Sequence, residues 1–153
     1  MKETRFIFHA IHSILINKIY PWQISSHQLV ELLNDKKNAK HTDLLQNIIN
    51  QIQKNFCDPA CCLDSIAASV GLSSAYVGKL YKRYTLKSVS ESINELRIEE
   101  AKHLLESCHR MTIADIAEKT GFSSGSYFSK SFRKETGMTP NEYRNLHKIS
   151  GEQ

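Results

Sequence analysis

The amino-acid sequence predicts an all-α fold, and three observations lead to that prediction. Apolar residues recur at the three- and four-residue intervals of a helix face in several segments, whereas no segment alternates apolar and polar residues as a strand would. Glycine and proline fall between the helical patterns rather than inside them. Several segments also follow a hydroxyl residue that has a carboxylate three positions later, which is the signature of a capped helix start.

The N-terminal part is expected to be a short helical extension or linker, residues 1–43. A helix is predicted over residues 6–20, before Pro21, and a shorter one over residues 27–34, followed by a polar linker. The apolar face of the first helix consists of Phe8, Ile11, Leu15 and Ile19. This face either folds back on the rest of the chain or pairs with a second copy as a homodimer, and the sequence favours neither.

Residues 44–150 are expected to form one compact helical domain. Thr42 is the expected N-cap of its first helix, whose apolar side consists of Leu44, Ile48, Ile49, Ile52 and Phe56. Later helix starts are marked by Ser88 with Glu91, Thr112 with Asp115, and Thr139 with Pro140 behind it. The pattern between residues 89 and 107 predicts one long helix of roughly 28 Å.

Composition and charge fit a globular protein of 153 residues, 41% of them hydrophobic and 24% charged. The net charge of +4 permits nucleic-acid binding without requiring it. The apolar stretch at residues 6–20 is interrupted by polar side chains, is shorter than the roughly 18 to 20 residues that span a bilayer, and lacks a signal-peptide cleavage site. We therefore expect no membrane partner and a cytoplasmic protein with reduced cysteines.

An internal repeat is the most informative feature of the sequence. The segment IAASVGLSS at residues 66–74 returns as IAEKTGFSS at residues 116–124. After one inserted residue, an aromatic and basic pattern follows in both copies: Tyr76, Lys79, Tyr81, Lys82 and Arg83 match Tyr127, Lys130, Phe132, Arg133 and Lys134. The glycine stands where one helix must stop, and the serines cap the next helix. This is the plan of a helix-turn-helix, whose second helix enters the major groove of DNA.

The charges gather on the two predicted second helices. Four cations and no acid lie between Ser74 and Ser88, and three cations with one acid lie between Ser124 and Thr139. Such clusters suit phosphate neutralisation. The long helix at residues 89–107 approaches the roughly 34 Å between successive major-groove faces. One chain is therefore predicted to place two recognition helices in successive major-groove segments.

Residues from about 44 to 146 resemble the DNA-binding domain of the AraC/XylS family of bacterial transcription regulators. The resemblance is carried by IADIA at residues 113–117, GFSS at 121–124, YFSKSFRK at 127–134 and GMTPNEYR at 137–144, and by LRIEEAKHLL at 96–105. It implies a seven-helix domain with two lobes in a sequence-specific regulator, an activator that contacts RNA polymerase. Family members commonly carry a sensory domain ahead of this one, so the chain is either a short regulator or the C-terminal portion of a longer one.

The resemblance also implies site residues. Base-facing positions would be Ala75, Tyr76, Gly78 and Lys79 in the first unit, and Gly125, Ser126, Ser129 and Lys130 in the second. Backbone contacts would come from Ser74, Arg83, Ser124, Arg133 and the helix N-termini that follow Thr112 and Thr139. Lys82 and Lys134 are also expected to contact DNA, because they lie in the same basic clusters. The aromatic residues Tyr76, Tyr81, Tyr127, Phe128 and Phe132 are expected in the core or half-buried rather than stacked on bases.

Three positions depart from the family pattern. Leu86 and Val89 stand where a glycine and an aromatic residue are usual, which predicts a reshaped turn after the first unit. Cys62 stands where a serine or threonine N-cap is usual. Ala75 and Gly78 are too small to read base edges, which leaves Lys79 as the main reader there and predicts a modest or shape-dependent sequence preference.

Other classes of function are less well supported. Cys57, Cys61 and Cys62 lack a strong zinc spacing, as do the pairs Cys108-His109 and His9/His12, so we expect no metal and no cofactor. No phosphate-binding glycine loop, nucleophile elbow or paired carboxylates suggest an enzyme. A sensory or interaction role for residues 1–43 is the remaining alternative.

Overall fold

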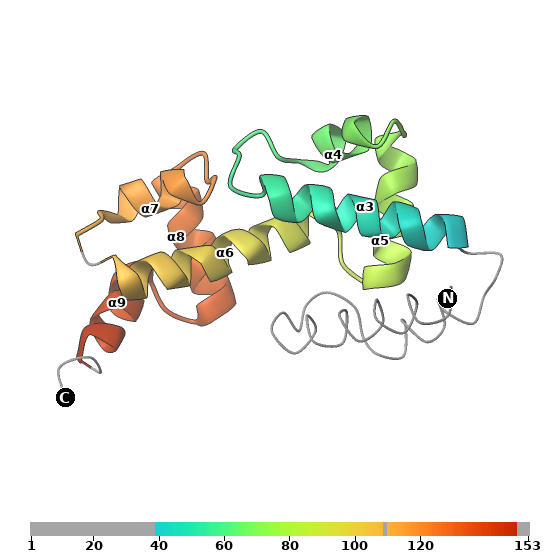
Figure 1. Cartoon of the computed structure of the whole chain (residues 1–153). Coiled ribbons are helices and arrows are strands. Elements are labelled where there is room, and N and C mark those ends of the chain that lie inside the picture. Colours follow the sequence, from blue (N-terminus) through green and yellow to red (C-terminus); the bar gives the residue numbers. More distant parts are fainter. Residues whose placement is uncertain (1–38, 109, 150–153) are drawn as a thin grey trace, which may run out of the picture.

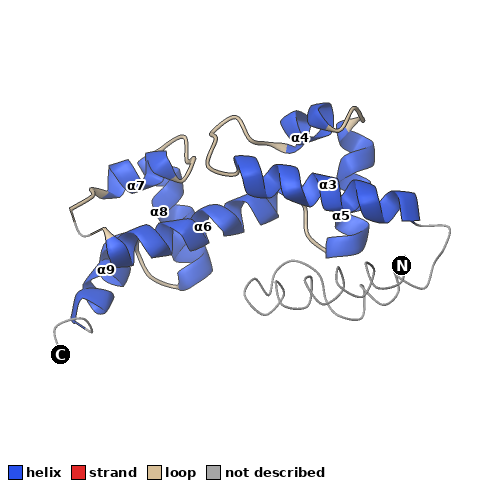
Figure 2. Ribbon diagram, in the orientation of Figure 1, coloured by secondary structure: helices blue, strands red, loops and turns tan. Residues whose placement is uncertain are grey.

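The computed structural model describes residues 39–108 and 110–149, and within these ranges every regular element is an α-helix. Figure 2 shows this all-helical architecture. The helices are α3 (Ala39–Asn55), α4 (Leu63–Ser69), α5 (Ser74–Thr85), α6 (Val89–Ser107), α7 (Ile113–Lys119), α8 (Gly125–Thr136) and α9 (Pro140–Ile149). The predicted all-α fold is confirmed. The two helices predicted before residue 39, with His9 and His12, lie outside the described residues, as does His109.

The helices form two lobes joined by α6 (Figure 1). In the first lobe α3, α4 and α5 pack on one another, and α3 and α5 also contact α6. In the second lobe α8 contacts both α7 and α9, and all three lie along the C-terminal part of α6. We refer to α4 with α5 as the first helix-turn-helix unit and to α7 with α8 as the second.

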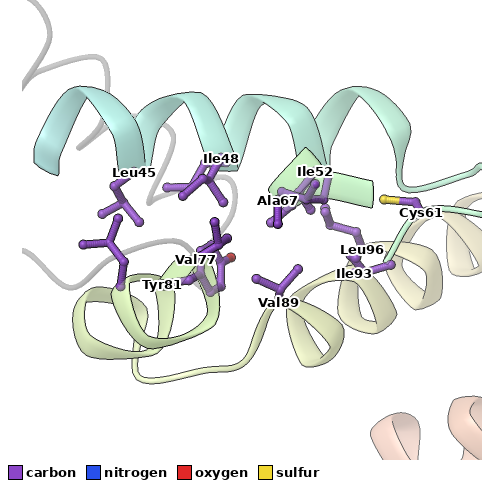
Figure 3. Packing of buried hydrophobic residues seen from close by; sticks show 13 residues of the cluster. Leu45, Ile48, Ile52, Cys61, Ala67, Val77, Tyr81, Val89, Ile93 and Leu96 are labelled. Atoms are coloured by element: carbon purple, nitrogen blue, oxygen red, sulfur yellow. The ribbon is translucent and has the colours of Figure 1, made fainter. Parts of the chain in front are cut away.

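Each lobe has its own hydrophobic core. In the first, Leu45, Ile48 and Ile52 of α3 face residues of α5 and α6 (Figure 3). The second core is aromatic, and the Phe128 and Phe132 rings lie edge to face with centroids 5.6 Å apart, an arrangement favoured by the ring quadrupoles. The two cores meet along α6, where Leu96 belongs to the first and Ile98 to the second.

The connector α6 therefore buries two different faces. Its first half buries Val89, Ser92, Ile93 and Leu96, and its second half buries Ile98, Ala101 and Leu105. At about 100° per residue, the mean directions of these two sets differ by roughly 160°. The lobes thus pack on nearly opposite sides of one straight helix, with Arg97 at the crossover.

The duplication extends further than the sequence repeat. The hydroxyl of Thr85, near the end of the first unit, donates to Tyr81 O (2.9 Å) and Lys87 O (3.1 Å). Thr136 donates in the same way to Phe132 O (2.8 Å) and Met138 O (3.0 Å). The helices α6 and α9 then both begin with a capping box, at Ser88 and Thr139 respectively. Each unit is therefore followed by the same turn and the same helix start.

Two local predictions were wrong. The helix α3 begins at Ala39, so Thr42 lies inside it rather than at its N-cap. The turn after the first unit is not reshaped, because Leu86 adopts the same left-handed conformation (φ 62°) as Gly137 (φ 80°). Cys62 does act as the N-cap of α4, and its amide donates to Ser65 Oγ at 2.9 Å. The division between residues 43 and 44 stays a prediction.

Candidate nucleic-acid interface

The second helix of each unit is held by a serine N-cap on one end and by its apolar face along one side. Ser73 Oγ accepts from Tyr76 N at 3.3 Å, and Ser124 Oγ accepts from Tyr127 N at 3.2 Å. These two caps are equivalent, and both helices are 12 residues long. The buried side of α5 holds Val77, Leu80, Tyr81 and Thr85, and that of α8 holds Phe128, Ser131 and Phe132. The other side chains of both helices are left to point outward.

The structure brings the predicted site residues onto α5, α8 and the helix starts beside them. The exposed members are Ala75, Tyr76, Lys79, Lys82, Arg83, Thr112, Ser124, Gly125, Ser126, Lys130, Arg133 and Lys134. The partly exposed members are Ser74, Gly78 and Ser129. No predicted site residue is buried in a core.

Six of these residues are cations, which we call the recognition-helix cations: Lys79, Lys82, Arg83, Lys130, Arg133 and Lys134. Within residues 39–108 and 110–149, the ion pairs join Lys87 to Glu95, Lys102 to Glu99 and His147 to Glu106. None of these pairs uses a recognition-helix cation. Lys87 belonged to the basic cluster in the sequence, but its Nζ lies 2.7 Å from a Glu95 carboxylate oxygen and its charge is compensated there.

The start of α5 differs from the start of α8 in one contact. The hydroxyl of Ser74 donates to the Asp64 carboxylate on α4. Because Ser73 and Ser124 are the equivalent caps, the residue equivalent to Ser74 is Gly125 rather than Ser124. The sequence repeat missed this shift, because it placed the inserted residue at Gly125, two positions after Ser123, where the structure has it. Ser74 can thus offer a ligand its backbone amide, while its side chain is engaged within the unit.

Two tyrosines expected in the core or half-buried are exposed. Tyr76 keeps 41% and Tyr127 keeps 54% of its surface, each on the first turn of its helix and three residues before Lys79 or Lys130. The Tyr127 ring lies 5.9 Å from that of Phe122. Tyr81, Phe128 and Phe132 are buried as predicted. Tyr127 was therefore missed as a surface residue, although its match to Tyr76 in the repeat could have identified it.

The starts of α7 and α9, both in the second lobe, carry negative charge as well as backbone amides. Asp115 accepts from Thr112 N at 2.9 Å, and Glu142 accepts from Thr139 N at 2.7 Å. The bonds between each carboxylate and its cap residue hold the pKa of Asp115 and of Glu142 below its ordinary value. An anion at either start would have to share the amides with these carboxylates.

The four cysteines are free thiols. Burial raises the pKa of Cys57 and Cys61, whereas a hydrogen bond from the Ser65 amide lowers the pKa of Cys62. In the described part of the chain, no three His, Cys, Asp or Glu side chains are arranged to hold a metal ion. Nor does that part contain a helix that is both long and apolar enough to cross a membrane.

The chain is similar to a known domain family and to known transcriptional regulators. A model of a helix-turn-helix domain matches residues 66–146. The chain is 33% identical over 101 residues to an uncharacterized HTH-type transcriptional regulator in the cgkA 5′ region of Pseudoalteromonas carrageenovora, covering 66% of this chain and 58% of that protein. It is 28% identical over 127 residues to the HTH-type transcriptional activator RhaR of Escherichia coli K12, covering 78% and 44%. It thus spans about half the length of these relatives, which are regulators and not enzymes.

Solved structures show the same two-lobed arrangement. The C-terminal domain of AraT, a response regulator from Geobacillus stearothermophilus, matches with a TM-score of 0.65 and 31% identity, over 67% of this chain and 84% of that one. An AraC-type regulator from Chromobacterium violaceum matches with a TM-score of 0.61 and 31% identity, over 72% and 96%. The DNA-binding domain of AdpA, solved with a target DNA, shares the fold at 19% identity, with a TM-score of 0.65 over 71% and 96%.

Proposed function

Because this chain belongs to the AraC/XylS family of bacterial transcription regulators, we propose that it regulates transcription by binding duplex DNA sequence-specifically, with α5 and α8 in two successive major-groove segments. The observation that carries the proposal is the repeated display of cations. The six recognition-helix cations stand on corresponding turns of α5 and α8, all are exposed, and none forms one of the ion pairs described above. Cations in this state can replace the counterions of DNA phosphates, which drives association.

The placement of the two units supports the spacing that DNA requires. In Figure 1, α4 and α7 lie on the upper side and α5 and α8 run downward behind the line of α3 and α6, so the units share an orientation in that view. The connector α6 has 19 residues. It is therefore about 28 Å long, close to the roughly 34 Å between successive major-groove faces.

The roles of individual residues follow from their positions on the two helices. We assign base contacts to Ala75, Tyr76, Gly78 and Lys79 in the first unit, and to Gly125, Ser126, Ser129 and Lys130 in the second. A lysine can donate to guanine O6 and N7, and serines can bond either a donor or an acceptor. We assign backbone contacts to Lys82, Arg83, Arg133 and Lys134, to Ser124, and to the starts of helices at Ser74, Thr112 and Thr139.

The regulatory sign and the partners follow from the family. RhaR is an activator, and on that similarity we assign activation to this chain, with RNA polymerase as the protein that it contacts. Since it would act on chromosomal DNA, we propose that it works in the cytoplasm. For residues 1–43 we propose either pairing with a second copy of the chain or packing back on the rest of it, and light scattering of the whole chain distinguishes the two.

Selection of bound sequences from a random duplex pool tests the proposal most directly. We expect two short preferred half-sites about one helical turn apart. Affinity for the selected duplex should fall steeply with salt and should fall further in the variant Lys79→Ala/Lys130→Ala. Lys102→Ala is the matched control, because Lys102 is paired with Glu99 on the connector. A wild-type chain that selects no sequence, or equal affinity of all three proteins for the selected duplex, would refute sequence-specific recognition by α5 and α8.

A further inference from the structure

The two lobes also touch beside both cores, at a point between Cys61 of the first core and Phe122 of the second. The loop that follows α3 in the first lobe, residues 56–61, approaches the turn of the second helix-turn-helix unit. Arg97 stands on α6 at this point, between Leu96 of the first core and Ile98 of the second. By helix geometry its side chain leaves α6 between the two buried faces.

Arg97 joins the lobes through its guanidinium. Its Nε donates to Phe56 O at 2.7 Å and its Nη2 to Asp58 O at 2.8 Å, and Nη2 also lies 3.5 Å from Cys61 O. The guanidinium carbon lies 5.8 Å from the centre of the Phe122 ring in the second unit. One planar cation thus binds three carbonyl groups of the first lobe and the face of an aromatic ring in the second.

The turn of the second unit makes an independent contact with the same loop. A Cβ on Gly121 would lie 2.7 Å from Cys57 O and 2.9 Å from Phe56 O, so only glycine permits this approach. The equivalent residue of the first unit, Gly71, would meet no atom within 4 Å. The close approach is therefore a property of the contact between lobes rather than of the helix-turn-helix itself.

The contact leads directly into the second recognition helix. Phe122, which faces Arg97, also packs against Tyr127 and Phe128 on the first two turns of α8, with ring centroids 5.9 Å and 5.1 Å away. A rotation of the second lobe would have to break the Arg97 contacts or drive Gly121 into the loop carbonyls. The direction of α8 is thus tied to the first lobe, which carries α5.

We infer that Arg97, Gly121 and the loop at residues 56–61 form a joint that fixes α8 relative to α5 and thereby sets the half-site spacing that the chain accepts. Arg97 is the positioning residue of this joint and need not touch DNA. The inference rests on the proposed function, since it concerns the spacing of two half-sites. Binding of one half-site raises the effective concentration of the other unit only when the geometry lets both engage together.

The first arm of the test needs no DNA. Residual dipolar couplings of backbone amides report whether the two lobes share one orientation. In the wild-type chain we expect one alignment tensor for both lobes, and in Arg97→Ala two tensors of different magnitude. Lys102→Ala, which removes another cation of α6, should keep one tensor. Two tensors in the wild-type chain, or one tensor in Arg97→Ala, would overturn the joint whatever the chain does with DNA.

The second arm measures binding to duplexes that contain both half-sites, either half-site alone, or both with one or two base pairs added or removed between them. We expect Arg97→Ala to bind single half-sites within about twofold of the wild type, and to lose at least about tenfold on the two-site duplex. Its affinity should also vary less with spacing. Equal losses on single and double sites would indicate general damage to the fold and contradict the inference.

One further measurement and one further variant keep the outcomes separate. Thermal unfolding establishes that each variant is folded, and if Arg97→Ala is not, Arg97→Lys replaces it, because lysine keeps the charge but not the forked donors. A wild-type chain that binds none of the duplexes would refute the proposed function, while the dipolar couplings would still decide whether the joint exists.

Discussion

The two helix-turn-helix units have nearly the same backbone, but different residues end their second helices. After the second unit Gly137 adopts the left-handed conformation without steric cost, whereas after the first unit Leu86 adopts it with 73% of its surface exposed. The same threonine hydroxyl bonds brace both turns, at Thr85 and at Thr136. The comparison teaches that the conformation is imposed by the surrounding hydrogen bonds, and that glycine relieves strain there rather than causing the turn.

The glycines inside the two units differ in the opposite way. Gly71 and Gly121 have similar positive φ angles, 70° and 81°, but only Gly121 faces backbone atoms of the other lobe. Equivalent positions in the repeat therefore carry different constraints. The turn of the first unit contacts no neighbouring atom at its glycine, whereas the turn of the second unit is held against the first lobe.

The largest expected effect comes from this pair of glycines. Gly121→Ala should lower the free energy of unfolding by about 3 kcal/mol or more, because its methyl group would clash with Cys57 O in addition to straining the backbone. Gly71→Ala should cost only about 1–2 kcal/mol, the penalty of the left-handed conformation. Urea unfolding of both variants measures the difference. Equal losses would show that the second turn is not held against the first lobe.

A second comparison concerns how each unit reads DNA. Ala75 and Gly78 offer no polar side chain and leave Tyr76 as the other base contact, so Lys79→Ala should remove most base preference from the first half-site, at about 1–3 kcal/mol of binding. Lys130→Ala should cost a similar amount but leave partial preference in the second half-site, because Ser126 and Ser129 remain. Binding to duplexes with single base changes tests this, and the same loss of preference in both half-sites would contradict the asymmetry.

Arg83→Ala is the control for these substitutions. It should weaken binding to all sequences alike and reduce the slope of affinity against salt by about one. A change in base preference would assign Arg83 to the bases instead of the phosphates.

The turns after the units provide a smaller effect of opposite sign. Leu86→Gly should raise the free energy of unfolding by about 1 kcal/mol, because it removes left-handed strain from an exposed leucine. Gly137→Ala should lower it by a similar amount. Thermal unfolding of the two variants measures both changes. A destabilised Leu86→Gly variant would contradict the strain that we assign to this leucine.

The smallest effect is expected at the capping boxes. The bonds between Ser88 and Glu91, and between Thr139 and Glu142, lower the pKa of both carboxylates. Their contribution to stability is thus complete above the ordinary glutamate pKa near 4.5 and is lost as the pH falls through the lower folded pKa. In Glu91→Gln/Glu142→Gln the unfolding temperature should depend less on pH in this range. An unchanged pH dependence would exclude the boxes as its source.

Much of the fold and the candidate site could be predicted because it depends on local patterns. The position of the glycine turns, the serine caps and the cations of α5 and α8 follows from spacing within a few residues. The two buried faces of α6 could not be predicted from the sequence. Apolar residues on opposite sides of a helix do not give the single three- and four-residue periodicity that identifies one buried face. The start of α3 was misplaced because a threonine suits a helix interior as well as a cap.

The contact of Arg97 was beyond sequence reasoning for a different reason. Its nearest acceptor, Phe56 O, is 41 residues away and is a backbone atom, which every residue type provides. Leu86 was misjudged because the predicted turn was derived from the preference of the residue, whereas the bonds of Thr85 determine the backbone. Tyr127 was misjudged because aromatic residues in a helix pattern are more often buried.

The opposed faces of α6 have a consequence for insertions and deletions. One residue added near Arg97 would turn the second lobe by about 100° about the helix axis while moving it only about 1.5 Å along it. The number of residues in the connector therefore affects the rotation of the second lobe much more than its distance from the first. An insertion of seven residues would come back to within about 20° of the original direction, so homologues with longer connectors should differ from this chain by steps of that size.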